Sequence, residues 1–359
     1  MGILYLHIGP DKTGSSSVQN FLSNYKSTKI KYIKFDFKLW KYFKSRPFSD
    51  THNNNDSSNN YFLEIKNILN KLDKGLDYII SEEGLSNLDV NGYIRLRNFL
   101  SEVFNNIIII YIYRNSFSYH LSALSQRFKN LTRYSKFRSF RSIYEVKRKN
   151  NQFIIRNCIK VFGIRNVKLI DFNLSSVSKN QLLISIFSLM KISLSDQNIS
   201  TNQLNIGLNL KQVITASFLI RLGKSKNLYE NQFIMKYFYA ELLKNFCNTK
   251  KIKINNIFTF ILLYWFFYKD VVYLKNKMNF HFEVDPLDFL TIQPINYFNY
   301  SYLALKLFRL RFPKHSPNFL DIILLYMLAF YRTGLSLLTF ILSAIFYLPI
   351  YIFVKYKKI

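Results

Sequence analysis

The first segment with residues suited to chemistry lies near the amino terminus, where the chain reads GPDKTGSSS over residues 9–17. Small residues at 13–17 leave room for an anion, and their hydroxyls add hydrogen-bond donors. A loop between a strand and a helix presents unpaired backbone N–H groups and the positive end of the helix dipole to an anion. The residues predicted to bind a phosphate are Gly9, Lys12, Thr13, Gly14, Ser15 and Ser16.

The order of residues in this loop differs from that of an ATP-binding loop. Such a loop ends in Gly-Lys followed by Ser or Thr, whereas here Lys12 precedes Gly14 and no lysine follows the glycine. A magnesium-dependent NTPase also needs an acidic residue closing a neighbouring strand, and the apolar run at 106–113 ends in Arg114 instead. The loop therefore suits a donor whose leaving group is stabilised by lysine, without a metal ion.

Three segments together resemble the sulfotransferases that use 3′-phosphoadenosine 5′-phosphosulfate (PAPS). HIGPDKTGSSSVQ, residues 7–19, is similar to the 5′-phosphosulfate loop of that family, especially to the bacterial HIGxxKTGTTS openings. Arg114 and Ser122 have the spacing of the family's second signature, an arginine that ends a strand and a serine eight residues later. YIISEE, residues 78–83, resembles the SSE strand end of bacterial relatives. The similarity covers roughly residues 1–190.

The resemblance implies a division of roles among these residues. Lys12 stabilises the bridging oxygen as the sulfuryl group leaves, and the amides and hydroxyls of residues 13–16 hold the 5′-phosphate. Arg114 and Ser122 hold the 3′-phosphate. Glu82, or else Glu83, takes the proton of the acceptor hydroxyl. The donor is then PAPS, no metal is expected, and the acceptor is a carbohydrate or glycolipid hydroxyl.

Other interpretations of the same residues stay open. Asp11 places a carboxylate beside the phosphate loop, and Ser15 and Ser16 stand where the family usually has two threonines. Glu82 also suits the first turn of a following helix, where the dipole favours an acid. The competing functions are a P-loop kinase or NTPase, and a catalytically degenerate sulfotransferase fold that serves as a membrane-attached binding protein.

Strands that alternate with helices must position these residues. Apolar, β-branched runs predict strands at 3–8, 77–80, 106–113 and 167–171. Amphipathic spacing predicts helices at 15–25, 61–72, 93–104, 118–129, 152–162 and 181–190. The polar stretch 50–60 is expected to be a loop or lid. This rhythm predicts an α/β fold with a parallel sheet flanked by helices, followed by a mostly helical, hydrophobic C-terminal region.

The end of the chain differs from the rest in its lack of charged residues. Residues 333–354 form an uncharged stretch of 22 residues. As a helix it would be about 33 Å long, enough for a hydrocarbon core of about 30 Å. A pair of buried core helices is the alternative. The expected organisation is a PAPS-binding domain at 1–205, a helical extension at 206–317 and a hydrophobic, membrane-associated tail at 318–359. A transmembrane helix there would hold the catalytic domain at the cytoplasmic face.

Composition narrows the class of protein further. With 359 residues, 49% of them hydrophobic, the chain can bury one large core or two modest ones. Its two cysteines, Cys158 and Cys247, make no disulfide framework and indicate a reducing compartment. The net charge of +29 is explained equally by lysine-rich codon bias and by attraction to a nucleotide, an acidic glycan or an anionic membrane. No nucleic-acid-binding motif is present, so no nucleic-acid partner is expected.

Overall fold

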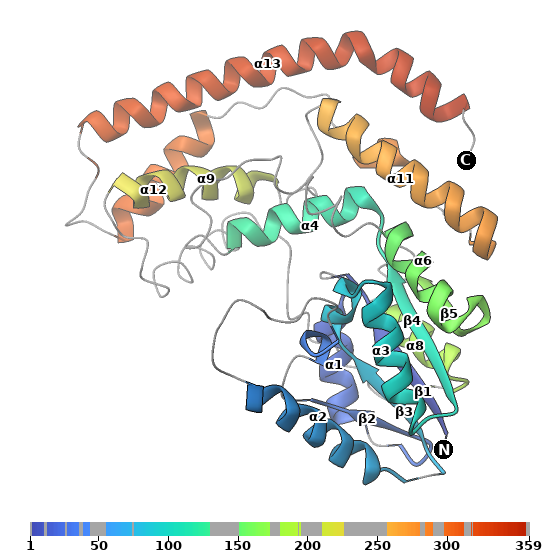
Figure 1. Ribbon diagram of the computed structural model, residues 1–359. Coiled ribbons are helices and arrows are strands. Elements are labelled where there is room, and N and C mark those ends of the chain that lie inside the picture. The colour runs from blue at the N-terminus through green and yellow to red at the C-terminus, as the bar shows by residue number, and fades with distance from the viewer. Residues whose placement is uncertain are drawn as a thin grey trace. The chain divides into compact units, whose positions relative to one another are not determined.

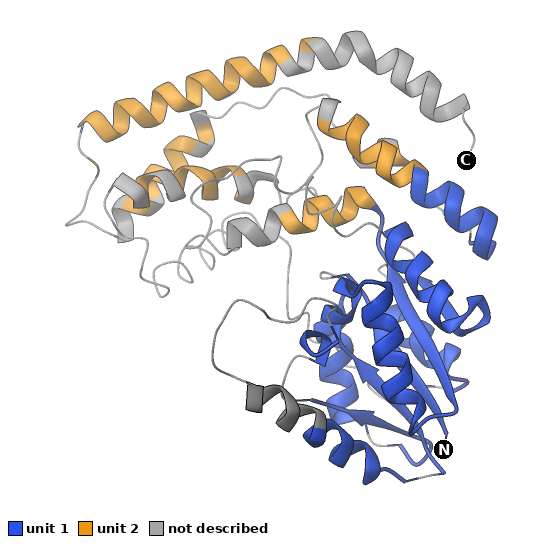
Figure 2. Ribbon diagram, viewed as in Figure 1, with its two compact units in different colours: residues 1–115, 148–204, 269–283 blue, residues 116–147, 205–268, 284–359 orange. Residues whose placement is uncertain are grey.

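The computed structural model divides the chain into two compact units (Figure 2). The first comprises residues 1–115, 148–204 and 269–283, and the second comprises 116–147, 205–268 and 284–359. The structure describes residues 2–10, 13–25, 27–35, 39–43, 55–73, 75–129, 151–172, 180–192, 194, 210–225, 257–280, 284–289, 298–311, 317 and 319–356. Each unit is discontinuous in sequence.

The first unit is built on a five-stranded parallel sheet (Figure 1). Its strands are β1 (Ile3–Ile8), β2 (Ile30–Ile33), β3 (Asp77–Ser81), β4 (Asn106–Tyr113) and β5 (Val167–Asp171). They lie in the order β2-β3-β1-β4-β5, and each neighbouring pair is parallel. The predicted α/β fold with a parallel sheet flanked by helices is therefore confirmed.

Helices cover both faces of this sheet. Alternate residues of β1 point to opposite faces, as the two-residue period of a strand requires. Leu4, Leu6 and Ile8 join a core with α2 (Asn55–Asn70), α3 (Val90–Ser101) and α6 (Asn151–Phe162). Tyr5 joins a second core with α1 (Ser15–Asn24) and α8 (Gln181–Leu189). Both faces are apolar, which explains why β4 is an almost continuous run of isoleucine and tyrosine.

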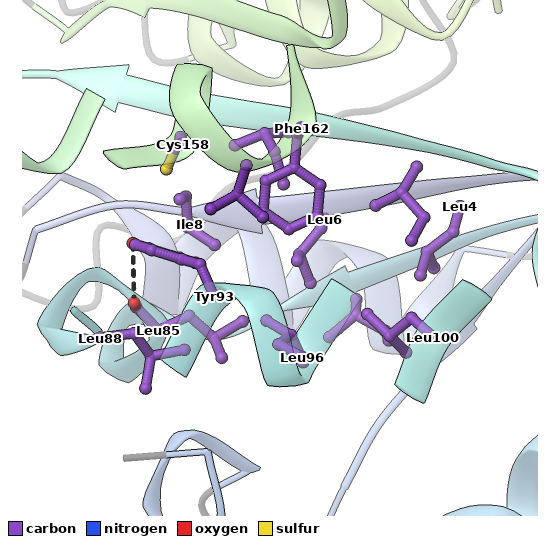
Figure 3. Close-up of a cluster of buried hydrophobic side chains, with 14 of the residues drawn as sticks. Leu4, Leu6, Ile8, Leu85, Leu88, Tyr93, Leu96, Leu100, Cys158 and Phe162 are labelled. Atoms are coloured by element: carbon purple, nitrogen blue, oxygen red, sulfur yellow. Dashed lines mark hydrogen bonds between the residues drawn. The ribbon is translucent and has the colours of Figure 1, made fainter. Parts of the chain in front are cut away.

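The larger core also contains polar groups, among them the hydroxyl of Tyr93 and the thiol of Cys158 (Figure 3). Tyr93 is fully buried, and its hydroxyl donates to the carbonyl of Leu85 at 2.9 Å. Cys158 packs in the same cluster, where burial raises the pKa of its thiol to about 12. This thiol stays protonated at neutral pH, so Cys158 fills space in the core and is not a nucleophile.

The described part of the second unit is helical. Its elements are α4 (Ser116–Lys129), α9 (Leu210–Ser225), the first half of α11 (Ile257–Met278), the 3₁₀ turn η4 (Pro286–Phe289), α12 (Phe298–Arg311) and α13 (Phe319–Tyr356). Helices α9, α12 and α13 contact one another, and α4 contacts α9. Ring contacts join Phe117 of α4 to Phe260 and Phe267 of α11. The expected helical C-terminal region is therefore present.

Three elements differ from the sequence expectations. Strand β2 was not predicted, and it pairs with β3 through only four residues, Ile30 to Ile33. Helix α2 begins at Asn55, inside the stretch 50–60 that was expected to be a loop or lid; asparagine, aspartate and serine are favoured where helices begin. Helix α13 continues through Arg332, so the uncharged stretch 333–354 is part of one helix of 38 residues.

Candidate functional site

The carboxyl ends of four strands meet at one edge of the sheet. In the β1–β3 register His7 is paired with Ser81, and in the β1–β4 register Ile8 is paired with Tyr111. Tyr113 at the end of β4 is in turn paired with Asp171 at the end of β5. Strands β2 and β3 lie on one side of β1, and β4 and β5 on the other (Figure 1). Open α/β sheets bind ligands at this edge, where the strand order reverses.

The loop after β1 folds back on itself through the hydroxyl of Thr13. This hydroxyl donates to the carbonyl of Pro10 at 2.9 Å and lies 3.3 Å from the hydroxyl of Ser15. Because Thr13 has only one hydroxyl proton, the hydroxyl of Ser15 must donate to it. A Cβ atom at Gly9 would lie 2.8 Å from the Thr13 oxygen, so a larger residue there would displace the Thr13 hydroxyl. Thr13 and Ser15, both buried, shape the loop, whereas Ser16 is exposed.

Gly14 sets the start of α1. It is the N-cap residue, with φ of 80° and ψ of 9°, a left-handed conformation that glycine adopts without strain. The amides of Ser17 and Val18 donate to its carbonyl. The earlier amides of a helix have no carbonyl partner within it, so the first turn of α1 offers N–H groups at the edge of the sheet. Lys12 and Asp11 lie outside the described residues.

Arg114, the residue after β4, lies beside this loop. The central carbon of its guanidinium is 4.6 Å from the centre of the Phe172 ring. The edge of that ring lies 3.4 Å from the place that a Cβ atom of Gly14 would occupy. Phe172 follows β5 directly, so one aromatic ring contacts the arginine and lies next to Gly14 of the loop. The structure thus brings the predicted cation and the predicted phosphate loop together.

Glu82 lies on the other side of the loop. Its backbone N–H donates to the carbonyl of His7 at 3.1 Å, which extends the β1–β3 pairing past the end of β3. One carboxylate oxygen, Oε1, accepts from the backbone N–H of Trp40 at 3.4 Å. Glu83 begins the 3₁₀ turn η2 (Glu83–Asn87). Both glutamates are half-buried, and Glu82 is the one tied to the strand that carries the loop.

Ser122 belongs to a different part of the molecule. It is half-buried on α4, in the second unit, whereas Arg114 is in the first. Its proposed partnership with Arg114 stays a prediction.

Two polar residues that the sequence did not single out support the end of β3. His7 is fully buried, and its Nδ1 lies 2.7 Å from the hydroxyl of Ser81. Burial lowers the pKa of His7 to about 4, so the imidazole is neutral at physiological pH. Gln19 of α1 donates through Nε2 to the carbonyl of Ser81 at 3.0 Å. In the sequence, only the presence of a histidine in the apolar strand ILYLHI could have pointed to this supporting role.

The arrangement is suited to binding an anion and removing a proton beside it. The N–H groups, the exposed hydroxyl of Ser16, the guanidinium and the carboxylate belong to residues that follow strands at the same edge of the sheet. A carboxylate within hydrogen-bond reach of a hydroxyl can act as a general base. Among the described residues, no three His, Cys, Asp or Glu side chains are grouped as metal ligands.

Comparison with solved structures gives a distant likeness. No model of a protein family matches the chain, and no curated protein matches it. The crystal structure of a sulfotransferase from Alicyclobacillus acidocaldarius is similar to it with a TM-score of 0.38 and 14% sequence identity. That likeness covers 65% of this chain and 98% of the other. At this identity and TM-score it establishes no family for the chain.

Proposed function

We propose that the protein is a sulfotransferase that moves a sulfuryl group from PAPS to a hydroxyl of a carbohydrate or lipid-linked glycan. The observation that carries the proposal is the position of Phe172, whose ring lies under the guanidinium of Arg114 and next to Gly14. Because of it, a cation stands beside a loop whose residue order suits PAPS better than ATP.

The proposed reaction assigns a task to each side of the loop. The carboxylate of Glu82 accepts the proton of the acceptor hydroxyl as the acceptor oxygen bonds to sulfur. The bond between sulfur and the bridging oxygen breaks, and Lys12 stabilises the charge that develops on that oxygen. The first turn of α1 holds the 5′-phosphate, and Arg114, with Ser122, holds the 3′-phosphate. Glu83 is the second candidate for the base.

A P-loop kinase or NTPase is the competing function, and one observation favours it. Strand β3 is the direct neighbour of β1, and it is followed by Glu82, so a carboxylate does close a strand next to the loop. In an NTPase that carboxylate would hold magnesium. The two functions therefore differ in the nucleotide bound and in the need for a metal.

Calorimetry with 3′-phosphoadenosine 5′-phosphate (PAP), the desulfated donor, tests the proposal. Full-chain wild type, Arg114→Ala and Lys12→Ala are titrated with PAP, and wild type is also titrated with ATP and Mg²⁺. Loss of a charged hydrogen bond costs about 1.5–3 kcal/mol, so Arg114→Ala should weaken PAP binding by about 10–100-fold. Lys12→Ala should abolish transfer from PAPS.

The matched control is Arg97→Ala, which removes an exposed arginine of α3. It should leave PAP affinity within about twofold, a difference of about 0.4 kcal/mol. Equal PAP affinity in wild type and Arg114→Ala would contradict the site assignment. Binding and hydrolysis of ATP with Mg²⁺, without PAP binding, would replace the sulfotransferase by an NTPase.

We also propose that α13 attaches the protein to a membrane, with the catalytic domain facing the cytoplasm. Among the described residues one helix is long and apolar enough to cross a bilayer, over Leu320–Leu338, with a mean hydropathy of 1.4. This stretch begins earlier than the span expected at 333–354. A membrane-attached transferase suits an acceptor that is itself a glycolipid or lipid-linked glycan.

The side chains of α13 support lipid as the partner. Leu325, Ala329 and Ser336 form a narrow buried stripe on a helix that contacts α9 and α12. Arg332 turns toward α9, where it donates to the hydroxyl of Ser217 at 2.7 Å and lies over the ring of Phe218. Charged residues of membrane helices point inward in this way. The exposed side chains are Leu320, Ile323, Leu324, Met327, Phe330, Tyr331, Leu335, Leu337, Leu338 and Ile341.

A further inference from the structure

A buried hydrogen-bond network fixes the main chain at Arg114. Asn151, the first residue of α6, donates through Nδ2 to the carbonyl oxygen of Arg114 at 3.1 Å. The same nitrogen donates to Oδ2 of Asp270 at 2.9 Å. The hydroxyl of Tyr111, on β4, donates to Oδ1 of Asn151 at 2.6 Å. Asn151 therefore uses both of its N–H groups and its oxygen, and it can occupy this place in only one orientation.

Asp270 completes the network from α11. Its Oδ1 accepts from the backbone N–H of Gln152 at 3.3 Å, while its Oδ2 accepts from Asn151. The carboxylate thus stands at the start of α6, where the helix dipole favours a negative charge. Asp270 and Asn151 are 4% and 6% exposed. Burial raises the pKa of Asp270 to about 7, and the two accepted hydrogen bonds act in the opposite direction.

A buried carboxylate is costly, and a hydrophobic pair of similar volume often stabilises a fold equally well. The presence of these polar residues in the core is better explained by the geometry that they impose on Arg114. The carbonyl of Arg114 is fixed by Asn151, while its guanidinium contacts Phe172 beside Gly14. With the backbone fixed at one end and the guanidinium stacked at the other, the arginine is preorganised, and preorganisation lowers the entropic cost of binding an anion.

We propose that Asn151 and Asp270 are positioning residues that fix Arg114 for recognition of the 3′-phosphate of the donor nucleotide. The inference rests on the proposed function, because it assigns Arg114 to that phosphate. It adds that selectivity for a 3′-phosphorylated nucleotide depends on a residue of α11, which is 156 positions further along the chain.

The test is the ratio of affinities for PAP and for adenosine 5′-monophosphate (AMP), which lacks the 3′-phosphate. Calorimetry on the full chain measures both nucleotides with wild type, Asn151→Leu and Asp270→Asn. Wild type should prefer PAP by about 10–100-fold, the effect of one charged hydrogen-bonding partner. Asn151→Leu should lower this ratio by at least about fivefold, and Asp270→Asn should lower it less, because one acceptor remains; AMP affinity should change by less than about twofold.

The matched control lies on the same helix. Asn157 is also buried on α6, and its Nδ2 has no hydrogen-bond partner among the described residues. Asn157→Leu makes the same change of side chain without touching Arg114, so the ratio should stay at the wild-type value. A merely destabilised protein would weaken both nucleotides together and leave the ratio unchanged.

A double-mutant cycle shows whether Asn151 acts through Arg114. In the Arg114→Ala background, adding Asn151→Leu should change the ratio by less than about twofold. A fall as large as in wild type would overturn the inference, as would an unchanged ratio in both folded variants, Asn151→Leu and Asp270→Asn. If wild type itself shows no preference for PAP over AMP, the proposed function fails, and that result is distinct from a wild-type preference that the variants retain.

Discussion

His7 shows how burial determines the chemistry of one side chain at the edge of the sheet. It is fully buried, its Nδ1 is hydrogen-bonded to Ser81, and its Nε2 has no partner among the described residues. Desolvation lowers its pKa from 6.5 to about 4. A histidine near a candidate site invites assignment as a general base, but a group with this pKa binds protons too weakly at neutral pH. Its task is to hold Ser81, the residue before Glu82.

This burial predicts an acid sensitivity of the first unit. Above pH 6.5 both the folded and the unfolded chain carry a neutral His7, and the stability is at its full value. As the pH falls from 6.5 to about 4 the unfolded chain binds a proton that the folded chain rejects, so stability is lost. At about 1.4 kcal/mol per tenfold change in proton affinity, the loss amounts to about 3 kcal/mol.

The measurement uses the two tryptophans. Trp40 lies in the first unit and Trp265 in the second, so Trp265→Phe leaves Trp40 as a reporter of the first unit. Urea unfolding at pH 7 and pH 4 is compared with and without His7→Gln, which removes the titrating group. The pH-dependent loss should be smaller by about 3 kcal/mol in His7→Gln. Equal losses in the two proteins would show that His7 is not a buried neutral residue.

The sequence predicted the residues of the loop and Arg114, but it could not predict what holds them. A loop of consecutive glycine, lysine and hydroxyl residues can be identified as a phosphate-binding loop from the local sequence alone. No local pattern identifies Phe172, Asn151 or Asp270, because their roles depend on contacts between distant parts of the sequence. Asn151 and Asp270, for example, are 119 positions apart. Thr13 was expected to bind the phosphate, and the structure shows its hydroxyl bonded to the carbonyl of Pro10.

At the level of the elements, patterns of apolar residues were sufficient where an element is long or buried on both faces. Strands β1, β4 and β5 have the predicted bounds. Strand β2 was missed because its four residues, Ile-Lys-Tyr-Ile, occupy the edge of the sheet and are too few to show a period. The sequence predicted an apolar segment that begins only after Arg332, because a charged residue interrupts a run of apolar residues. The helix itself continues through Arg332.

The start of α1 gives a prediction that separates binding from stability. A Cβ atom at Gly14 would lie 2.9 Å from Leu182, and the residue has φ of 80°. Gly14→Ala should therefore displace the first turn of α1 and weaken PAP binding by about tenfold, or about 1.4 kcal/mol. It should also destabilise the first unit by about 1–3 kcal/mol, from backbone strain and overpacking.

Gly163 is the control, because it also has a positive φ, of 85°, at the start of the 3₁₀ turn η3 (Ile164–Asn166), and its Cβ position is open. Gly163→Ala should lower the free energy of unfolding, since only glycine readily adopts this conformation. Its affinity for PAP, measured by calorimetry, should stay within about twofold of wild type. A similar loss of affinity in both variants would mean that general destabilisation, not the geometry of the loop, reduces binding.

At the scale of the whole molecule, the chain combines a five-stranded parallel sheet with a long apolar helix, α13. Most of the exposed side chains between Leu320 and Leu338 are large and apolar, and 17% of that stretch is buried. Contiguous exposed apolar surface of this kind marks a site of association. The net charge of +29 adds attraction to anionic headgroups. The proposed contact of α13 with lipid would explain both the apolar surface and the inward direction of Arg332.

Synthesis of the full chain in the presence of preformed vesicles, followed by flotation, tests this attachment. Met327 and Phe330 are 62% and 72% exposed, so Met327→Glu with Phe330→Glu removes apolar contact with lipid without disturbing α9 or α12. Each buried apolar side chain is worth about 1.5–3 kcal/mol, and the double variant should lose at least about tenfold in the bound fraction. Phe153→Glu, at a position on α6 that is 54% exposed, should float like wild type. If the double variant also floats like wild type but changes its oligomeric state, the surface binds a second copy of the chain, and the membrane assignment of α13 is wrong.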